Sequence, residues 1–189
     1  MARPLSQEKR KALLTSAAEL VATLGTGAPT AKIAQAAKVS EGTLFTYFPT
    51  KEDLLNQLYL EIESGFAEAI LAPYPGGENG RKQLRLLWNR LIDWGLANPT
   101  RRKAMRQLKV SDRINATIRN RCEAKFHETH ATVERSLSGH ADPALMPFYI
   151  DTVLFGLTEI VIEAIVINPQ DGEKIRNAGF DLFWKGTAA

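Results

Sequence analysis

The sequence has one cysteine, Cys122, three histidines, and no apolar run long enough to cross a bilayer. A single thiol makes no internal disulfide, and a membrane-spanning helix needs about 18 or more consecutive apolar residues. The N-terminal segment MARPLSQEKRKALL has no apolar core of the signal-peptide kind. We therefore expect a soluble, cytoplasmic protein.

Motifs for catalysis and for metal binding are also missing. The chain has no G-x-S-x-G, no glycine-rich phosphate loop and no convincing Ser/His/Asp set. His127 and His130 are three residues apart, but Cys122 lies five residues before His127. These residues do not have the spacing of a four-ligand metal site. We expect no enzyme, no cofactor and no metal site.

The charge of the chain is small in total but unevenly spread. The net charge of +3 over 189 residues combines +4 in residues 1–51, −6 in 52–80, +10 in 81–125 and −5 in 126–189. Two basic blocks separated by an acidic one favour a polyanionic partner. The most basic run, TRRKAMRQLK at 100–109, is interpreted as a solvated face that adds long-range attraction.

Apolar residues recur at three- and four-residue spacing along nearly the whole chain, and alternating strand patterns are absent. Capping residues and prolines mark where the helices begin, and residues 72–80 (APYPGGENG) are the strongest loop signal. The sequence predicts an all-α fold of about nine helices. They are expected after Ser6 up to Gly25, at 30–37, from Ser40 to Pro49, at 51–71, 81–97, 100–110, 111–138, 144–167 and 170–185.

The stretch VSEGTLFTYFPTKEDLL, residues 39–55, predicts a two-turn helix that is too short to be stable alone. A second short helix precedes it, which is the layout of a helix-turn-helix whose second helix enters the major groove of DNA. Ile33, Leu44 and Phe48 are expected to face inward. The outward face is then Ser40, Glu41, Gly42, Thr43, Thr46 and Tyr47. The alternative is that the aromatic residues at 45, 47 and 48 are all core.

Two further residues suit contacts with the DNA backbone. Thr30 begins a helix, where free N–H groups attract a phosphate. Lys51 begins the next long helix, where a cation opposes the helix dipole unless a phosphate lies nearby.

The pattern T-x-x-I-A-x-x-A-x-V-S-x-G-T-L-F-x-Y-F-x-T-K-x-x-L at 30–54 resembles the TetR/AcrR family of transcriptional regulators. The resemblance implies a homodimer that binds a palindromic operator and releases it when a small molecule enters the C-terminal domain. It also implies phosphate contacts by Thr30, Tyr47 and Lys51, and groove contacts by Gly42 and Thr43.

Within that pattern, Lys38 stands where the family often has glycine, so the turn is strained if its φ is positive. Arg3, together with Lys9, Arg10 and Lys11, either reaches the neighbouring groove or the backbone of DNA, or belongs to a disordered tail. A second segment, W-N-x-x-I-x-W-G-L-x-x-P at 88–99, is similar to RamR-type repressors of multidrug-resistance regulons. We expect a DNA-binding domain at 1–51, a linking helix at 51–72, and ligand-binding and dimerisation functions within 52–189.

The segment 146–168 is apolar on nearly every side. One chain of this size is not expected to have enough other helices to bury all of that surface. We therefore expect a homodimer through the last two helices, packed as a four-helix bundle. The candidate seam residues are Leu157, Val161, Ile165, Phe180, Phe183 and Trp184.

Aromatic residues and a few polar ones predict an effector site in the second half of the chain. The candidates are Tyr59, Phe66, Trp88, Ile92, Thr152, Phe155 and Glu159. The alternative is ordinary core, with the acids Asp151 and Glu159 paired to the arginine-rich block. The function we expect is a ligand-responsive DNA-binding regulator, a dimeric repressor released by a small aromatic or cationic molecule. The alternative function is a helical small-molecule-binding or catalytic protein whose helix-turn-helix is purely structural.

Overall fold

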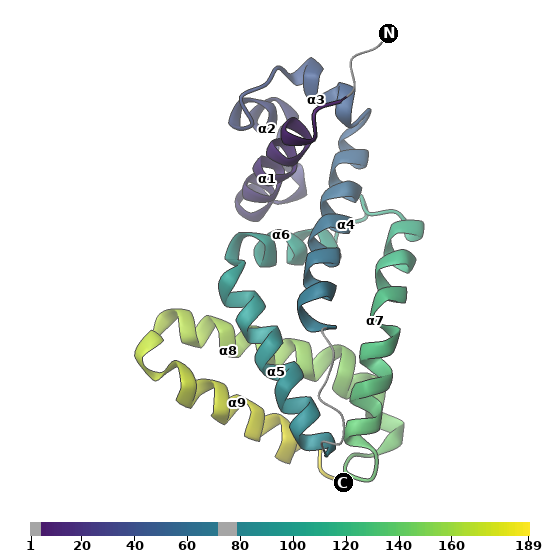
Figure 1. The fold of residues 1–189 in the computed structure, drawn as a ribbon, viewed down its shortest axis with the longest axis vertical. Helices are drawn as coiled ribbons and strands as arrows, with labels where there is room; N and C mark the ends of the chain where they lie inside the picture. Colours follow the sequence, from purple (N-terminus) through teal and green to yellow (C-terminus); the bar gives the residue numbers. More distant parts are fainter. Residues whose placement is uncertain (1–4, 72–78) are drawn as a thin grey trace. The chain divides into compact units, whose positions relative to one another are not determined.

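A computed structural model describes residues 5–71 and 79–189, and in these residues the chain is all-α with no strand (Figure 1). The predicted fold class is confirmed. Arg3 and most of the predicted 72–80 loop lie outside the described residues. The nine α-helices of the described residues are α1 Gln7–Leu24, α2 Thr30–Ala36, α3 Glu41–Tyr47, α4 Lys51–Ile70, α5 Gly80–Ala97, α6 Pro99–Lys109, α7 Ala116–Leu137, α8 Phe155–Ile167 and α9 Gly172–Gly186.

Side-chain caps fix the starts of the first helices where the sequence predicts them. Ser40 Oγ accepts a hydrogen bond from the Thr43 N–H at 3.2 Å, and Ser6 Oγ accepts one from Lys9 at 3.3 Å. At α4 the Thr50 N–H donates to Asp53 at 3.1 Å, and the Asp53 N–H donates to Thr50 Oγ1 at 3.0 Å. This reciprocal pair is a capping box, which satisfies two N–H groups that the helix itself leaves unbonded.

The chain forms two compact units, and the first consists of Met1–Gly65 and Asn98–Ala124. In it α6 packs against α1, with Ala104 and Leu108 at 0% exposure, so one side of the basic 100–109 run is core. The expectation that this run is a solvated face therefore holds for its other side only. The predicted division into a DNA-binding and a ligand-binding domain at residue 51 stays a prediction, because the two units are defined by compactness and not by function.

Within this first unit a buried asparagine joins two distant segments. Asn56, at 6% exposure, donates from Nδ2 to the Arg113 carbonyl at 3.1 Å and accepts from the Asn115 N–H at 3.1 Å. A buried amide is costly unless its donors and acceptor are bonded, and here both ends are. Asn56 therefore fastens α4 to the turn that precedes α7.

The second unit consists of Phe66–Ala97 and Lys125–Ala189, and its core lies where α5, α8 and α9 meet. The close approach of these helices depends on Gly179: a Cβ built there would lie 2.4 Å from Val161 Cγ2 and 2.9 Å from the Trp88 ring. No helix among the described residues is both long enough and apolar enough for a membrane span.

The predicted helix at 144–167 is helical throughout, but it is not one regular α-helix. The segment instead contains a 3-10 turn at Pro143–Leu145, a π-helix at Phe148–Leu154, and then α8. Pro147 has no backbone N–H and so removes one bond of the regular α-helical pattern, whereas Pro143 begins the 3-10 turn, where its N–H would have no helical partner. A π-helix widens each turn to an i→i+5 bond, so the faces predicted from α-helical spacing shift along this segment.

Most of the predicted dimer seam is also wrong, because Val161, Ile165, Phe180 and Phe183 are buried within one chain. They pack α8 and α9 onto α5. Leu157 and Trp184 are half-buried. The large apolar residues that these helices expose are Ile160 (65%), Val166 (58%), Ile167 (82%) and Leu182 (66%).

Candidate DNA-binding and effector sites

The short helix α3 is held by one face and exposed on the other. Leu44 is 0% and Phe48 2% exposed, whereas Ser40, Glu41, Gly42 and Thr46 are exposed and Thr43 and Tyr47 half-buried. A Cβ added at Gly42 would meet nothing within 4 Å, so the backbone there is open to an approaching molecule. A two-turn helix is therefore stable here because its apolar side is packed, as the sequence predicts.

The hydroxyl of Tyr47 is bonded to the start of α1. It accepts a hydrogen bond from the Ser6 N–H at 2.9 Å. A phenol that accepts still has its own O–H to donate, so Tyr47 keeps one donor for a phosphate while its ring orientation is fixed.

The other hydroxyls on this surface make local hydrogen bonds. Thr30 Oγ1 donates to Glu41 Oε1 at 2.6 Å, and Thr46 Oγ1 donates to the Gly42 carbonyl at 2.9 Å. Ser40 Oγ and Thr43 Oγ1 lie 2.9 Å apart and share one hydrogen. The predicted DNA-contacting residues Thr30 and Glu41 are thus brought together from two helices.

Lys51 begins α4 in an electropositive position. Burial lowers the pKa of its ammonium group below the usual value, Arg113 lowers it further, and Glu52 opposes the shift. Arg113 also pairs with Glu52. A nearby phosphate would favour the charged form of Lys51, which agrees with the predicted backbone contact.

Two residues near this surface were missed or left open by sequence reasoning. Arg113 is 61 residues from Glu52, and no local pattern indicates that pairing. Phe45 was a core candidate, but it is 40% exposed on α3, whereas Phe48 is core. The preceding turn has Lys38 at φ 57°, so the condition under which strain was expected there is met.

Of the predicted effector residues, Tyr59 lies in the first unit and the other six in the second. Tyr59 is 5% exposed. Burial raises the pKa of its phenol well above the usual value, and the Glu63 carboxyl, which accepts its hydrogen bond, raises it further. Glu63 is itself 6% exposed and was missed, although the i, i+4 spacing of the pair was available in the sequence.

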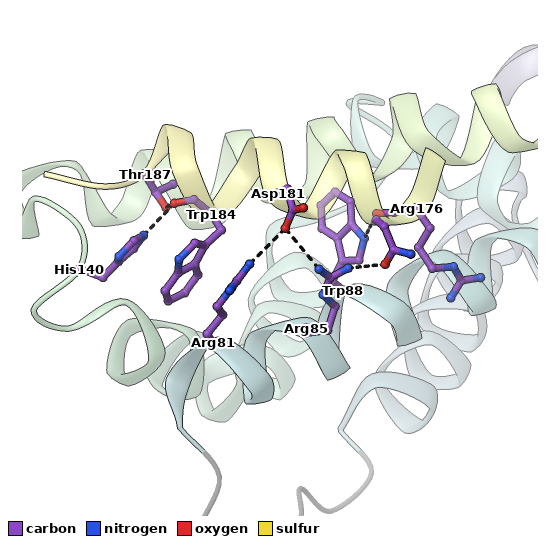
Figure 2. Close-up of polar contacts among 9 residues, drawn as sticks. Arg81, Arg85, Trp88, His140, Arg176, Asp181, Trp184 and Thr187 are labelled. Atoms are coloured by element: carbon purple, nitrogen blue, oxygen red, sulfur yellow. Dashed lines mark hydrogen bonds and ion pairs between the residues drawn. The ribbon is translucent and has the colours of Figure 1, made fainter. Parts of the chain in front are cut away.

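Trp88 lies in the core of the second unit (Figure 2). Its Nε1–H donates to the Arg176 carbonyl at 3.1 Å, and its ring packs edge-on against Phe180 at 6.0 Å between centroids. With 0% exposure, Trp88 contacts a ligand only if this packing opens. Ile92 is also 0% exposed, and Phe66 packs against Trp94 at 4.8 Å.

The remaining candidates lie on the π-helix and α8. Thr152 is exposed, and Phe155 and Glu159 are half-buried. Asp151 is on the surface and lies 3.4 Å from His130 Nε2, so its partner is a histidine of α7 and not the arginine-rich block. The roles of these residues in ligand binding stay predictions.

Arginines of α5 also anchor α9 in this unit, as Figure 2 shows. Arg81 and Arg85 approach Asp181 at 3.2 and 3.4 Å, and the Arg85 guanidinium lies 3.9 Å from the Phe180 ring centroid. Burial lowers the pKa of Arg85, which Asp181 partly offsets. These two basic residues of the 81–125 block thus hold α5 and α9 together.

Comparison with known proteins agrees with this geometry. Residues 13–58, which include α2 and α3, match the family model described as bacterial regulatory proteins, tetR family. A structure described as a TetR-family transcription regulator from Shewanella sp. PV-4 is 27% identical, with 96% of this chain and 98% of that one covered and a TM-score of 0.82. The chain has the TetR-type fold, with a TetR-family N-terminal domain.

Structures of two other transcriptional regulators share this fold at lower identity. FadR from Bacillus subtilis, in complex with stearoyl-CoA, is 20% identical, covers 94% of this chain and 98% of its own, and has a TM-score of 0.69. LfrR from Mycobacterium smegmatis, in complex with proflavine, is 19% identical, covers 97% and 99%, and also has a TM-score of 0.69. At these identities the likeness concerns the TetR-type fold alone.

Proposed function

We propose that this protein is a dimeric repressor of TetR type that binds operator DNA through α3 and is released by a small molecule. The observation that carries the proposal is the exposed polar face of α3, opposite the buried Leu44 and Phe48. A helix that served packing alone would not need an open backbone at Gly42.

The proposed DNA contacts divide into two kinds. Tyr47, Lys51 and Thr30 contact phosphates, which sets position and affinity, while the residues of the α3 face read base edges. Arg113 joins the phosphate contacts, because it lies beside Glu52 and shifts the pKa of Lys51.

Dimerisation is supported by the apolar residues that α8 and α9 leave exposed. Ile160 and Ile167 lie seven residues apart on α8, and Leu182 is on α9, which packs against α8 in the same chain. Residues seven apart share one face of a helix. A second copy of this helix pair would cover that surface, and two recognition helices would then meet half-sites about 34–36 Å apart or somewhat wider.

The proposed effector is an aromatic or cationic small molecule. Aromatic residues and a buried carboxylate, that of Glu63, suit a flat cation. The proflavine complex of LfrR supports this class, whereas the stearoyl-CoA complex of FadR supports a fatty acyl ligand. Binding would lower operator affinity by a coupling energy of roughly 1–3 kcal/mol. The RamR-like subtype stays a prediction.

A gel-shift experiment with the gene's own upstream region, at two salt concentrations, tests the DNA-binding function. We expect a specific complex that survives excess random DNA and weakens as salt rises. Equal affinity for operator and random DNA would support the alternative, a structural helix-turn-helix.

Quenching of tryptophan fluorescence by cationic dyes and by acyl-CoA separates the two effector classes. Quenching that is unchanged in Trp88→Phe removes that residue from the site.

A further inference from the structure

The recognition helix has no side chain that can give guanine two hydrogen bonds. Its sequence, EGTLFTY at Glu41–Tyr47, contains no arginine, lysine, asparagine or glutamine. Guanine O6 and N7 are both acceptors and are usually read by a bidentate donor from arginine or lysine, while asparagine or glutamine reads adenine. α3 must therefore read other groups.

The hydroxyls of this face offer only one free donor to a base. Thr46 already donates to the Gly42 carbonyl, and Ser40 and Thr43 use one of their two hydrogens on each other. The Ser40–Thr43 pair keeps one hydroxyl hydrogen, and the exposed side chains of α3 are Thr46, the Phe45 ring and the Glu41 carboxylate.

Glu41 is fixed before any DNA arrives. Thr30 donates to Oε1 at 2.6 Å, and Glu41 lies in the first turn of α3, where the helix dipole stabilises a negative charge. A carboxylate accepts about four hydrogen bonds, so this one bond leaves capacity for another donor. A side chain that is already oriented loses less conformational entropy when it binds.

A carboxylate in the major groove discriminates strongly between bases. It accepts from the N4 amino group of cytosine, and it is repelled by the acceptor edges of guanine and thymine. Adenine also offers an amino donor at N6, but its N7 acceptor lies beside that donor and repels the carboxylate, so cytosine is favoured. It is also repelled by phosphates, so a misplaced Glu41 weakens binding to wrong sites.

We propose, on the basis of the DNA-binding function above, that Glu41 specifies a cytosine in each half-site by accepting from its N4 amino group. Thr30 is the positioning residue that orients the carboxylate. Phe45 and the threonine methyls contact thymine methyl groups beside it, so α3 reads pyrimidine edges, and any guanine is specified through its paired cytosine.

Selection from a randomised duplex library tests the proposal. The wild type is expected to require one C·G pair per half-site, by about tenfold or more over each other pair, which is within the range for a side-chain–base contact. Glu41→Gln should lose that preference and move towards adenine, which a carboxamide reads. Lys51→Ala is the control, because it should weaken all sequences alike.

A modified base tests the same contact with the unaltered protein. N4-methylcytosine at the selected position should weaken wild-type binding about tenfold and leave Glu41→Gln binding unchanged. Thr30→Val should flatten the preference at that position alone, and Thr30→Ser should restore it.

An unchanged base profile in Glu41→Gln, or wild-type tolerance of N4-methylcytosine, overturns the inference and leaves the repressor function standing. A wild type that selects no sequence at all overturns both.

Discussion

The hydroxyl oxygen of Tyr47, at the end of α3, lies 2.9 Å from the backbone nitrogen of Ser6, which is 41 residues away and caps α1. One hydrogen bond therefore fixes the far end of the recognition helix to the start of the first helix. Thr30 and Glu41 connect the other end of α3 to α2. The helix presents its outer face as part of a rigid frame.

Lys51→Ala should weaken binding to operator and random DNA by the same factor. The ammonium group contacts a phosphate in our proposal, and a phosphate carries no base information. The slope of log affinity against log salt should decrease by about 1. Titrations at several salt concentrations measure this. A loss confined to the operator would contradict the assignment.

Thr43→Val should change which bases are preferred, since it replaces a hydroxyl on the α3 face by a methyl group. The substitution removes the hydrogen bond between the Ser40 and Thr43 hydroxyls. The capping bond from the Thr43 backbone N–H to Ser40 Oγ remains. We expect a change at one position of the selected site, with random-sequence affinity kept. An equal loss on both DNAs would mean that Thr43 only maintains the helix.

Leu182→Glu should convert the proposed dimer to a monomer of 20.9 kDa at micromolar concentration, because it places a charge on the apolar face of α8 and α9. Sedimentation equilibrium measures the mass. Val110→Glu is the matched control, since Val110 is 81% exposed but lies outside these helices, and its dimer should persist. Two variants with equal masses would reject this surface as the interface.

Gly179→Ala should destabilise the protein by about 1–3 kcal/mol, because its new methyl group would overlap Val161 and the Trp88 ring. Gly156→Ala on α8 is the control: nothing lies within 4 Å of its Cβ position, so the better helix propensity should stabilise by up to about 1 kcal/mol. Urea unfolding measures both. Equal effects would show that the α8–α9 packing is looser than described.

Lys38→Gly should stabilise the protein by about 1 kcal/mol, since glycine adopts the positive φ of this turn without steric cost. Lys38→Ala removes the same charge but keeps a Cβ, and it should bring no such gain. If alanine stabilises as much as glycine, the effect is electrostatic and the strain is absent.

Tyr59→Phe should reduce the loss of stability at alkaline pH. Because the folded-state pKa of Tyr59 is raised, its contribution is present below the unfolded value of about 10 and declines as pH rises above it. The decline is at most about 1.4 kcal/mol per pH unit. Urea unfolding between neutral pH and pH 11 measures it, with Tyr149→Phe as control. Identical profiles for both variants would contradict the burial of this phenol.

Local patterns in the sequence predicted the fold well. Caps at Ser6, Ser40 and Thr50 and the apolar spacing around Leu44 are short-range signals, and the structure has them all. The face of α8 could not be predicted, because it depends on which residues α5 covers and on a π-helix that shifts the register. The Thr30–Glu41 bond likewise depends on tertiary packing, as does the approach of Arg113 to Glu52.

Asn56 fastens α4, and α6 covers α1. Both contacts matter for the design of a fragment that contains the predicted DNA-binding domain alone. A fragment that stops at residue 51 would leave apolar surface of α1 bare and would lack the amide clamp. A stable fragment therefore has to combine two segments of the chain, one that ends at Gly65 and one that begins at Asn98, joined by a designed linker.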